Sequence, residues 1–524
     1  MKITLISTLI APSDQGLRTI SSVLKKEGHN VNIVFMVLNK DYSKLYSKKE
    51  LSQLREICRN SELIGVSAFT STAPRAIQII EFLELIFPEK NIILGGVHAT
   101  LFPEDCIKHS KIVCIGEGEE AIIDLVNTIE AKKSIDKIKN LWIRKRDRII
   151  KNPIRPLIEN LDKLPFLDFE LNDHFILDGG TIRKFQEKDL KKELSFLTGR
   201  GCPYGCDYCS NNLFNQIYKG KCKTILRWHS PKYIIDCALY LKNKFPQSFK
   251  FFDIRDDSFF LRPINQIKEF CKDYKIKVGI NFKCIADPRT VTEEKVKLLV
   301  EAGCTDISMG IEGCERVNKE IYHRNMTDEQ VINAANILNK YKDKMSVSYE
   351  IITSNPYETP EDIINLIRLI QKIPKPYRPA VNNLVFFPNT VLYKRAVEDG
   401  IIKSYKDTGS NLDYNDRAKH ILLKKKNIYL NLIVNLMRGV AIENKIGIIP
   451  DSMLNYLLEE KRIKRNLNNP GLAITLTRGL IIYDFIKYKI FKKLYSKAPL
   501  FIKNIYIKIK YGGKIYYTEQ RIDS

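Results

Sequence analysis

The 524-residue sequence lacks several features that would mark it for export or for a membrane. It opens with no secretory signal, and it has no run of about 18 uncharged apolar residues, so we expect no membrane-spanning helix. It also lacks the G-x-G-x-x-G fingerprint of dinucleotide-binding folds and the P-loop of nucleotide triphosphatases. With 44% hydrophobic and 28% charged residues, the composition is that of a folded, soluble protein.

A disulfide framework is also missing, although the chain has 12 cysteines. Most of them are scattered singly, and several lie inside apolar stretches: Cys58, Cys106, Cys114, Cys237 and Cys271. Buried reduced thiols are the simplest interpretation of that placement. The pattern favours a reducing cytoplasm, a compartment that also tolerates an oxygen-sensitive cluster.

Acidic residues are scarce relative to basic ones, which gives a formal net charge of +24. The surplus is greatest after residue 400, where 24 Lys and Arg face 10 Asp and Glu. Such a surplus can indicate nucleic acid, anionic lipid or an acidic substrate as a partner. A general lysine bias of the source proteome explains it equally well, and the composition does not separate these alternatives.

The first 130 residues alternate strand-like and helix-like patterns. The predicted strands are 2–7, 31–37, 63–67, 91–94 and 112–115, and the predicted helices are 17–27, 74–87 and 119–129. This rhythm predicts an open, Rossmann-like parallel sheet covered on both faces. A hairpin of 141–144 with 149–151 follows, and then a proline-containing extended linker at 152–168.

A second α/β series runs from about residue 194 to residue 400. Its six predicted strands are 195–198, 250–254, 278–282, 306–310, 346–352 and 381–387. Six strands with intervening helices predict a partial (β/α)6 barrel of the TIM type, whose chemistry lies at the carboxyl ends of the strands. Beyond it we predict a small, mostly helical, basic domain with helices at 421–440, 454–464 and 474–497. The predicted division is 1–140 for the Rossmann-like domain, 141–190 for the hairpin and linker, 191–400 for the barrel and 401–524 for the basic, mostly helical domain.

Three cysteines stand close together just after the first strand of the second series. Their spacing C-x3-C-x2-C defines three candidate ligands: Cys202, Cys206 and Cys209. Gly201 and Gly205 give the backbone freedom that wrapping a cuboidal cluster requires. Three thiolates on a four-iron cluster leave one iron open to a chelating substrate. Two other interpretations stay open, a structural zinc site with Cys222 as the nearest fourth ligand and three unrelated core thiols.

The segment 198–209 resembles the cluster motif of the radical S-adenosylmethionine (radical SAM) superfamily, including the aromatic residue before the last cysteine, Tyr208. The resemblance implies a 4Fe–4S cluster that reduces S-adenosylmethionine and releases a 5′-deoxyadenosyl radical, which abstracts hydrogen from a substrate. It further implies that Tyr208 lies near the adenine. An electron donor such as a flavodoxin or ferredoxin is expected as a partner.

Other barrel segments resemble those that contact S-adenosylmethionine in this family. Asp256 and Asp257 follow the second strand, like the acidic residues that receive the methionine amino group. Adjacent carboxylates at a strand end are also common as surface or helix-capping residues. The segment 310–315 (GIEGCE) resembles the family turn Gly-Ile-Glu-Ser-Gly-Ser-Glu, with Glu312 as the matching acid and Cys314 as a departure.

Two further turns match with departures. The segment 354–359 (SNPYET) resembles Gly-Leu-Pro-Gly-Glu-Thr, and Glu358 is its site residue. Because both glycines are replaced, we expect the backbone of this turn to be built differently. The segment 387–390 (FPNT) resembles the Pro-Gly-Thr turn after the sixth strand.

Loops that follow the strands of the first series are similar to those of the cobalamin-binding domain found in one large radical SAM subgroup. The implied cofactor-binding residues are Ser67, Thr70, Ser71, Gly95, Gly96, His98, Gly116, Glu117 and Gly118. The segment 161–165 (LDKLP) adds to the resemblance. The Asp-x-His-x-x-Gly motif that supplies an axial histidine to cobalt elsewhere is absent, as is common in this subgroup. His98 has a simpler interpretation as a polar loop residue, and the domain alternatively serves as a scaffold without cobalamin.

The resemblance implies an enzyme that transfers a methyl group through cobalamin to an unactivated carbon of a small-molecule or lipid-like substrate. Radical rearrangement or oxidative ring closure is an alternative chemistry. A non-catalytic iron–sulfur sensor or nucleic-acid-binding protein is an alternative of another class, suggested by the aromatic and lysine residues at 483–495. We do not expect nucleic acid as the partner, and we expect at most a peripheral membrane contact through the basic C-terminal domain.

Overall fold

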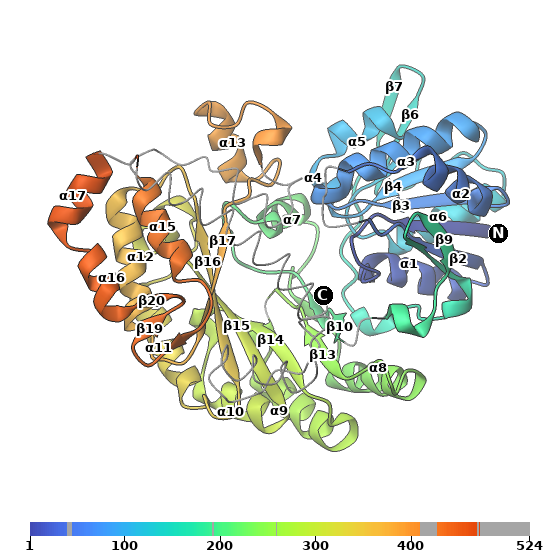
Figure 1. The fold of residues 1–524 in the computed structure, drawn as a ribbon. Coiled ribbons are helices and arrows are strands. Elements are labelled where there is room, and N and C mark those ends of the chain that lie inside the picture. The colour runs from blue at the N-terminus through green and yellow to red at the C-terminus, as the bar shows by residue number, and fades with distance from the viewer. Residues whose placement is uncertain (39–43, 191–192, 258, 409–426, 469–470, 472–524) are drawn as a thin grey trace. The chain divides into compact units, whose positions relative to one another are not determined.

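A computed structural model of the chain describes residues 1–38, 44–190, 193–257, 259–408, 427–468 and 471. The chain forms two compact units, each assembled from segments that are separate in the sequence (Figure 1). The first unit consists of residues 1–233, 243–249 and 386–413. The second consists of residues 234–242, 250–385 and 414–524. The boundaries predicted after residues 140, 190 and 400 stay a prediction.

The first unit is built on a nine-stranded sheet. Its strands are β1 (Lys2–Ser7), β2 (Asn30–Phe35), β3 (Leu63–Ser67), β4 (Asn91–Gly95), β5 (Ile112–Cys114), β6 (Leu141–Lys145), β7 (Arg148–Lys151), β8 (His174–Asp178) and β9 (Thr181–Lys184). They lie in the order β7-β6-β5-β4-β3-β1-β2-β8-β9. Strands from β5 to β8 in this order are parallel, and the hairpins β6–β7 and β8–β9 close the two edges. The predicted parallel sheet is confirmed.

Helices cover both faces of this sheet because its strands are apolar on both sides. The helices are α1 (Gln15–Lys26), α2 (Lys48–Cys58), α3 (Ala73–Ile86), α4 (Val97–Leu101), α5 (Pro103–His109) and α6 (Glu119–Glu130). Along β1, Leu5 packs into the core shared with α1 and α6, whereas Ile6 packs into the core shared with α2, α3 and α5. This alternation is the period-2 pattern of a strand buried on both sides.

The hairpin of β8 and β9 lies within the segment 141–190, in which only the β6–β7 hairpin and a linker were predicted. Asp178 pairs with Thr181 across the turn, which Gly179 and Gly180 form with φ values of 57° and 83°. Two successive left-handed residues are the geometry of a type I′ hairpin turn, for which Gly-Gly is a recognised sequence signal. The linker prediction for this stretch is therefore wrong, and the sequence contained the sign that it is a hairpin.

The second unit contains parallel strands that follow one another in chain order. These are β13 (Phe251–Ile254), β14 (Phe282–Ala286), β15 (Cys304–Glu312), β16 (Ser346–Thr353) and β17 (Arg378–Asn383). The helices between them are α9 (Ile264–Asp273), α10 (Glu293–Glu301), α11 (Asp328–Asn339) and α12 (Pro360–Lys372). This succession confirms the predicted strand–helix repeat of a partial barrel.

One strand of the barrel begins later than the sequence suggested. Residues 274–278, with a buried Tyr274 and a buried Val278, continue the helix that precedes them as a π-turn. Gly279 then adopts a left-handed φ of 63°, and β14 starts at Phe282. A short apolar run cannot be assigned to helix or strand by periodicity alone, which is why 278–282 was predicted as the strand.

The remaining elements connect the sheets or follow them. They are β10 (Glu193–Phe196), β11 (Gly199–Arg200), α7 (Ser210–Tyr218), β12 (Arg227–Trp228), α8 (Pro231–Lys244), α13 (Val391–Glu398), α15 (Ile428–Leu436), β18 (Ala441–Ile442), β19 (Lys445–Ile446), β20 (Ile449–Pro450), α16 (Asp451–Leu457) and α17 (Glu460–Asn468). The small sheet of β18, β19 and β20 was not predicted. The predicted helix at 474–497 lies outside the described residues.

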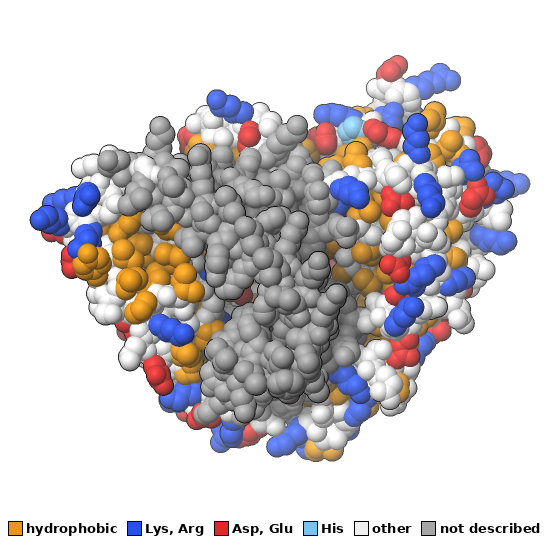
Figure 2. Space-filling model, viewed as in Figure 1, with side chains coloured by type: hydrophobic (Ala, Val, Ile, Leu, Met, Phe, Trp, Pro, Cys, Tyr) orange, Lys and Arg blue, Asp and Glu red, His pale blue; other side chains and the backbone are white. Residues whose placement is uncertain are grey.

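The surface carries both signs of charge. Lys and Arg side chains are interspersed with Asp and Glu over the described residues visible in Figure 2. Exposed apolar side chains of the second unit include Ile448, Met453 and Tyr456. Among the helices described, none is both long and apolar enough to cross a membrane.

Candidate functional site

The predicted cluster ligands lie on one loop between β11 and α7. Cys206 is buried, with 7% of its surface exposed, and Cys202 and Cys209 are half-buried. None of the three forms a disulfide bond. Tyr208, predicted to lie near an adenine, is half-buried on the same loop. The loop thus presents three thiols and an aromatic ring within eight residues, 202–209.

Helix α7 holds the backbone of this loop. It begins directly after Cys209, whose N–H donates to the carbonyl of Cys206 at 3.0 Å. Two asparagines on the first turns of the helix reach back to loop carbonyls. Asn215 Nδ2 donates to the Cys202 oxygen at 2.9 Å, and Asn212 Nδ2 donates to the Gly205 oxygen at 3.1 Å. These side-chain amides satisfy two carbonyls of the loop without any contribution from the thiols.

The two loop glycines differ in what their positions require. Gly201 has φ of 94°, and a Cβ there would lie 2.2 Å from the carbonyl oxygen of Ile225. Gly205 has no left-handed φ, and a Cβ there would meet nothing within 4 Å. Backbone freedom is therefore essential at Gly201, and the prediction that Gly205 supplies it as well is wrong.

The donor set of the loop fits an iron–sulfur cluster. Among the residues described, no group of three or more His, Cys, Asp or Glu side chains is arranged around a single metal ion. A mononuclear zinc site needs its donors in one coordination sphere, whereas each cysteine of a cluster binds a different iron. The three thiols of the loop are the number that a four-iron cluster with one open iron requires.

The carboxyl edge of the first sheet brings together the first group of predicted cobalamin contacts. Ser67 ends β3, and its carbonyl accepts from Thr8 Oγ1 at 3.1 Å. Thr70 is buried in the short 3-10 turn η1 (Thr70–Thr72), and Ser71 beside it is half-buried. These residues place hydroxyl groups at the edge where open α/β sheets bind ligands.

The next loop is pressed against the first. Gly95 ends β4 and accepts from the Ala68 N–H at 3.0 Å, and Gly96 has φ of 95°. A Cβ on Gly96 would lie 2.8 Å from the Ala68 carbonyl oxygen, so only glycine fits there. His98 is not a polar loop residue but a buried residue of α4, with Nδ1 3.4 Å from Thr70 Oγ1. Burial lowers the pKa of His98 to about 4, so its ring is neutral near pH 7.

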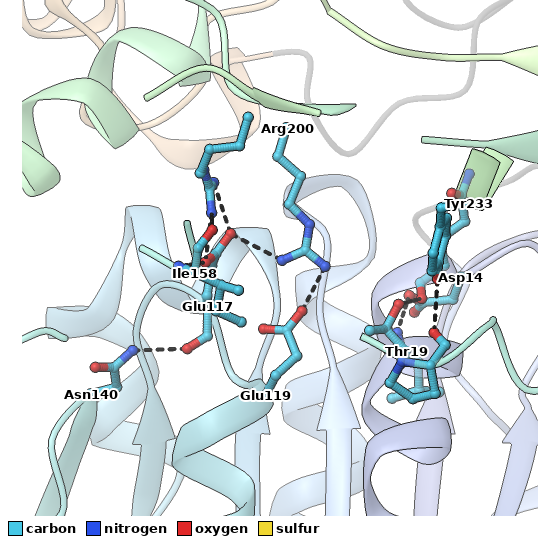
Figure 3. Close-up of polar contacts among 12 residues, drawn as sticks. Asp14, Thr19, Glu117, Glu119, Asn140, Ile158, Arg200 and Tyr233 are labelled. Atoms are coloured by element: carbon cyan, nitrogen blue, oxygen red, sulfur yellow. Dashed lines mark hydrogen bonds and ion pairs between the residues drawn. The ribbon is translucent and has the colours of Figure 1, made fainter. Parts of the chain in front are cut away.

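The third loop, after β5, is occupied by side chains of the cysteine-loop segment. The Glu117 N–H donates to the Tyr218 hydroxyl at 3.0 Å, and a Cβ on Gly116 would lie 2.0 Å from that hydroxyl. The Glu117 carboxylate accepts from Arg200 Nη1 at 3.0 Å and from Arg227 Nη1 at 3.0 Å (Figure 3). Gly116 and Glu117 therefore have protein neighbours of their own, and the contact of Gly116, Glu117 and Gly118 with cobalamin stays a prediction.

Charge compensation in this region is complete. Arg200 Nη2 also donates to Glu119 at 2.6 Å, so two arginines face two glutamates. Burial favours the neutral acid, but the charges of Arg200 and Arg227 outweigh it and hold the pKa of Glu117 below its usual value. Asn140 Nδ2 donates to the Glu117 carbonyl at 2.8 Å (Figure 3). The Glu117 carboxylate is thus ionised, and its oxygens are engaged by protein donors.

The segment 161–165, also predicted to belong to the cobalamin-binding domain, caps the start of α8. Asp162 accepts from the Ser230 N–H at 3.0 Å and lies 3.1 Å from His229 Nδ1. His229 in turn stacks on Tyr233, with ring centroids 3.9 Å apart. This contact gives the segment a structural role in the first unit.

In the second unit, the two adjacent acids after β13 have different surroundings. Asp256 is buried, 3.8 Å from Arg262 Nη2, whereas Asp257 is exposed. A third acid, Asp253 on the strand itself, is buried and pairs with Lys283 Nζ at 3.2 Å. Asp256 and Asp257 therefore do not form one uniform pair, although both stand at the carboxyl end of the strand.

Glu312 ends β15 in a left-handed conformation, with φ of 56°. Its carboxylate lies 3.1 Å from Arg324 Nη1, and Arg324 Nη2 also donates to Asp287 at 2.9 Å. Burial raises the pKa of Glu312 to about 7 despite the charge of Arg324. A Cβ on Gly310 would lie 2.3 Å from Glu312 Oε1, so the glycine of this turn makes room for the acid.

The turn after β16 keeps a left-handed residue although its glycine is replaced. Ser354 has φ of 62°, and its N–H donates to Asn431 Oδ1 at 3.1 Å while its hydroxyl donates to Asn383 at 2.7 Å. The prediction that this backbone must be built differently is wrong at Ser354, because hydrogen bonds from neighbouring elements hold the strained residue. In the segment 387–390, Asn389 stands where the family turn has glycine and is also left-handed, with φ of 66°.

Glu358 follows in the same turn and is 1% exposed. Among the described residues its Oε2 has no hydrogen-bond partner, and its carbonyl accepts from Asn427 Nδ2 at 2.8 Å. Burial, followed by the charge of Asp362, raises the pKa of Glu358 to about 8. A buried carboxyl with an oxygen that has no hydrogen-bond partner among the described residues is the type of group that a bound cationic or hydrogen-bonding ligand satisfies.

Several residues of the site were not singled out from the sequence. They are Arg200, Glu119, Tyr218, Arg227, Arg324, Asn427 and Asn431. A signal for Arg200 was present, since it is the charged residue inside the glycine-rich segment before Cys202. The others are brought to the site by tertiary folding from segments with no recognisable motif.

Comparison with protein families finds a match for each of two segments of the chain. Residues 196–370 match the family described as the radical SAM superfamily, and residues 1–126 match the B12 binding domain. The chain is a radical SAM enzyme with an N-terminal B12-binding domain. Its cofactors are a 4Fe–4S cluster, S-adenosylmethionine and cobalamin, as predicted.

Curated relatives cover much of the chain at low identity. An uncharacterized methyltransferase of Pyrococcus horikoshii is 24% identical over 398 residues, which is 74% of this chain and 79% of the relative. The bacteriochlorophyllide d C-8(2)-methyltransferase of Chlorobaculum tepidum is 22% identical, covering 65% of this chain and 69% of the relative. An anaerobic magnesium-protoporphyrin IX monomethyl ester cyclase of Cereibacter sphaeroides is 25% identical, and the match spans 48% of its length.

Solved structures share the fold. The radical S-adenosylmethionine methyltransferase TsrM of Kitasatospora setae, bound to tryptophan and an S-adenosylmethionine analogue, aligns with a TM-score of 0.60 at 15% identity over 76% of each chain. The cobalamin-dependent radical enzyme OxsB, bound to aqua-cobalamin and S-adenosylmethionine, aligns with a TM-score of 0.60 at 15% identity, covering 100% of this chain and 77% of OxsB. The order of the two domains is thus a shared architecture.

Proposed function

We propose that the chain is a cobalamin-dependent radical SAM methyltransferase for a small-molecule substrate, with Cys202, Cys206 and Cys209 as the cluster ligands. The carrying observation is a loop of three thiols whose backbone is held by α7, in a chain that matches both families. When bound, the cluster and S-adenosylmethionine supply a radical that activates the substrate, and cobalamin supplies the methyl group.

The chain's own residues bind and orient these groups. Tyr208, on the cysteine loop, is proposed to contact the adenine. At the strand ends of the second unit, Asp256, Asp257, Glu312 and Glu358 are proposed to contact S-adenosylmethionine. Support comes from the buried, proton-retaining carboxyl of Glu358, which can donate a hydrogen bond near pH 7, as an ionised glutamate cannot.

Cobalamin is proposed to bind at the carboxyl edge of the first sheet through hydroxyl and backbone contacts. The residues involved are Ser67, Thr70, Ser71, Gly95 and Gly96. His98 is not assigned to cobalt, because its neutral ring is buried beside Thr70 and Phe102. The absence of the Asp-x-His-x-x-Gly motif supports the same assignment.

Oxidative ring closure is the second candidate reaction. It is favoured by the cyclase of Cereibacter sphaeroides, whose identity to this chain, 25%, is similar to that of the methyltransferases. The names of the relatives include two tetrapyrrole-modifying enzymes, so tetrapyrroles are among the substrates to test first.

Partners and location form part of the proposal. We propose a cytoplasmic enzyme that receives electrons from a flavodoxin- or ferredoxin-like protein. A peripheral membrane contact through residues 401–524 is supported by their 24 basic residues against 10 acidic ones. Retention on anionic but not neutral vesicles, lost in 0.5 M salt, tests that contact.

The decisive assay follows 5′-deoxyadenosine and S-adenosylhomocysteine after reduction of anaerobically reconstituted protein. Cys206→Ala is expected to abolish both products, and Cys222→Ala, which alters a half-buried cysteine outside the loop motif, is expected to leave them unchanged. Deoxyadenosine with S-adenosylhomocysteine supports methyl transfer. Deoxyadenosine alone, in the presence of a tetrapyrrole that becomes oxidised, supports ring closure and overturns the methyltransferase proposal.

A further inference from the structure

Two arginines stand directly opposite each other at the entrance to the cysteine loop. In the antiparallel pair β11–β12, Arg200 faces Arg227, and Gly199 faces Trp228. Like charges opposite each other on adjacent strands destabilise the pair unless an anion lies between them. Space is also short, since a Cβ on Gly199 would lie 2.4 Å from the Trp228 ring. The ribbon therefore needs a countercharge from outside.

Glu117 is that countercharge, and it comes from the B12-binding domain. One carboxylate oxygen lies 3.0 Å from Arg200 Nη1 and 2.9 Å from Arg227 Nη2, and the other accepts from Arg227 Nη1 at 3.0 Å. The side chains of Glu117 and Arg227 are 17% and 5% exposed. Without the Glu117 charge, Arg200 would keep only Glu119, and Arg227 would keep the Ile158 carbonyl. Leaving a partly buried arginine with less compensation costs more than an exposed pair contributes.

The other flank of the cysteine loop reaches the same residue. Helix α7 begins after Cys209 and ends at Tyr218, whose hydroxyl accepts from the Glu117 backbone N–H at 3.0 Å. Gly116 leaves the space for that hydroxyl, since a Cβ there would lie 2.0 Å from it. The side chain of Glu117 thus binds the strand that precedes the cysteine loop. The backbone N–H of Glu117 binds the helix that follows the loop.

We propose that Glu117 is a positioning residue that couples the two cofactor sites, by tying both flanks of the cysteine loop to the loop after β5 of the B12-binding domain. The coupling rests on the proposed function, because it assigns the cluster to the cysteine loop. A tie of this kind makes the binding of one group depend on the presence of the other, and the dependence is reciprocal. Glu117 need not touch either cofactor for this.

The tie itself is tested on the full chain without cofactors. In Glu117→Gln, amide hydrogen exchange in peptides covering residues 199–209 is expected to accelerate about tenfold or more over the wild type. Glu84→Gln is the matched control: Glu84 is 13% exposed, accepts a backbone N–H from Lys111 at 2.9 Å and faces Arg144. Tyr218→Phe, which removes no charge, is expected to accelerate exchange at Glu117. Unchanged exchange in both variants overturns the tie.

The coupling is tested by the affinity of aqua-cobalamin, measured with and without the reconstituted cluster. The wild type and Glu84→Gln are expected to show affinities that differ about fivefold or more between the two states, and Glu117→Gln a ratio near one. The coupling alone is overturned if the wild type takes up iron but binds aqua-cobalamin equally well with and without the cluster. It is also overturned if Glu117→Gln keeps the wild-type ratio of the two affinities. A wild-type chain that takes up no iron overturns the proposed function and the coupling with it.

Discussion

Glu117 in the first unit differs from Glu358 and Glu312 in the second in how its buried carboxyl is compensated. Glu117 lies between two arginines that hold its pKa below the usual value, whereas burial raises the pKa of Glu358 to about 8 and that of Glu312 to about 7. A fully compensated carboxylate serves the architecture, because every lone pair has a partner. An under-compensated one stores an unfavourable interaction that a ligand can relieve.

Left-handed backbone has different causes at two pairs of positions near the proposed sites. In the first unit, left-handed φ values at Gly96 and Gly201 occur where a Cβ would collide with neighbouring backbone. In the second unit, Glu312 and Ser354 are left-handed although they carry side chains, and hydrogen bonds or an ion pair hold each of them. Glycine at the first two positions is a packing requirement, whereas the strain at the other two accompanies polar groups at strand ends, where ligands bind in barrels.

The largest expected effect on iron binding is at Gly201. Gly201→Ala introduces a Cβ 2.2 Å from the Ile225 carbonyl oxygen at a left-handed residue, which we expect to cost about 3 kcal/mol and to lower iron content after reconstitution severalfold. Gly205→Ala is the matched control, because its Cβ would meet nothing within 4 Å and it should retain the iron of the wild type. Equal iron content in the two variants would show that the loop is not fixed at Gly201.

An effect on stability alone is expected from pH. The folded pKa of Glu358, about 8, lies above its ordinary value of 4.5, so its contribution to stability is full below pH 4.5 and is lost as pH rises toward 8. For Glu117 the sign is opposite, since a lowered pKa contributes stability that is lost only below its ordinary pKa of 4.5. Cofactor-free protein should therefore lose up to roughly 4 kcal/mol between pH 5 and 8 through Glu358, at about 1.4 kcal/mol per pH unit.

Urea unfolding of the second unit at pH 5 and pH 8 measures this slope. Glu358→Gln should flatten it, and Glu361→Gln, an exposed glutamate on α12, should not. If the pH dependence of stability survives in Glu358→Gln, the Glu358 carboxyl is compensated in solution. The contrast between Glu358 and Glu117 would then disappear.

The smallest effect concerns the strained serine. Ser354→Gly removes the steric cost of a left-handed residue, about 1 kcal/mol, but also loses the hydrogen bond to Asn383 and adds freedom to the unfolded chain. We expect the melting temperature to change by only a few degrees in either direction. A large loss would show that the serine side chain, rather than the backbone, maintains the turn.

Much of the fold could be predicted because its strands and helices carry strong local periodicity. The parallel sheet of the first unit and the order of strands in the second follow from runs such as 63–67 and 346–352. The β8–β9 hairpin was not predicted, although the pair Gly179-Gly180 is a sequence signal for its turn. The start of β14 could not be found from periodicity, because the apolar run that precedes it is helical.

The site was predictable only where its chemistry is local in the sequence. The three cysteines share one loop, so their spacing was sufficient. The partners of Glu117 come from residues 83 and 110 positions away, Arg200 and Arg227, and no short motif connects them. The buried state of His98 and the split between Asp256 and Asp257 likewise depend on packing that adjacent residues do not encode.

The central claim is that the cysteine loop carries a cluster with one iron open to S-adenosylmethionine. Electron paramagnetic resonance of the reduced, reconstituted protein tests it most directly. We expect a 4Fe–4S signal that shifts when S-adenosylmethionine is added. The signal should be lost in Cys206→Ala but kept in Cys222→Ala. A signal that ignores S-adenosylmethionine, or a protein that holds zinc and no iron, would contradict it.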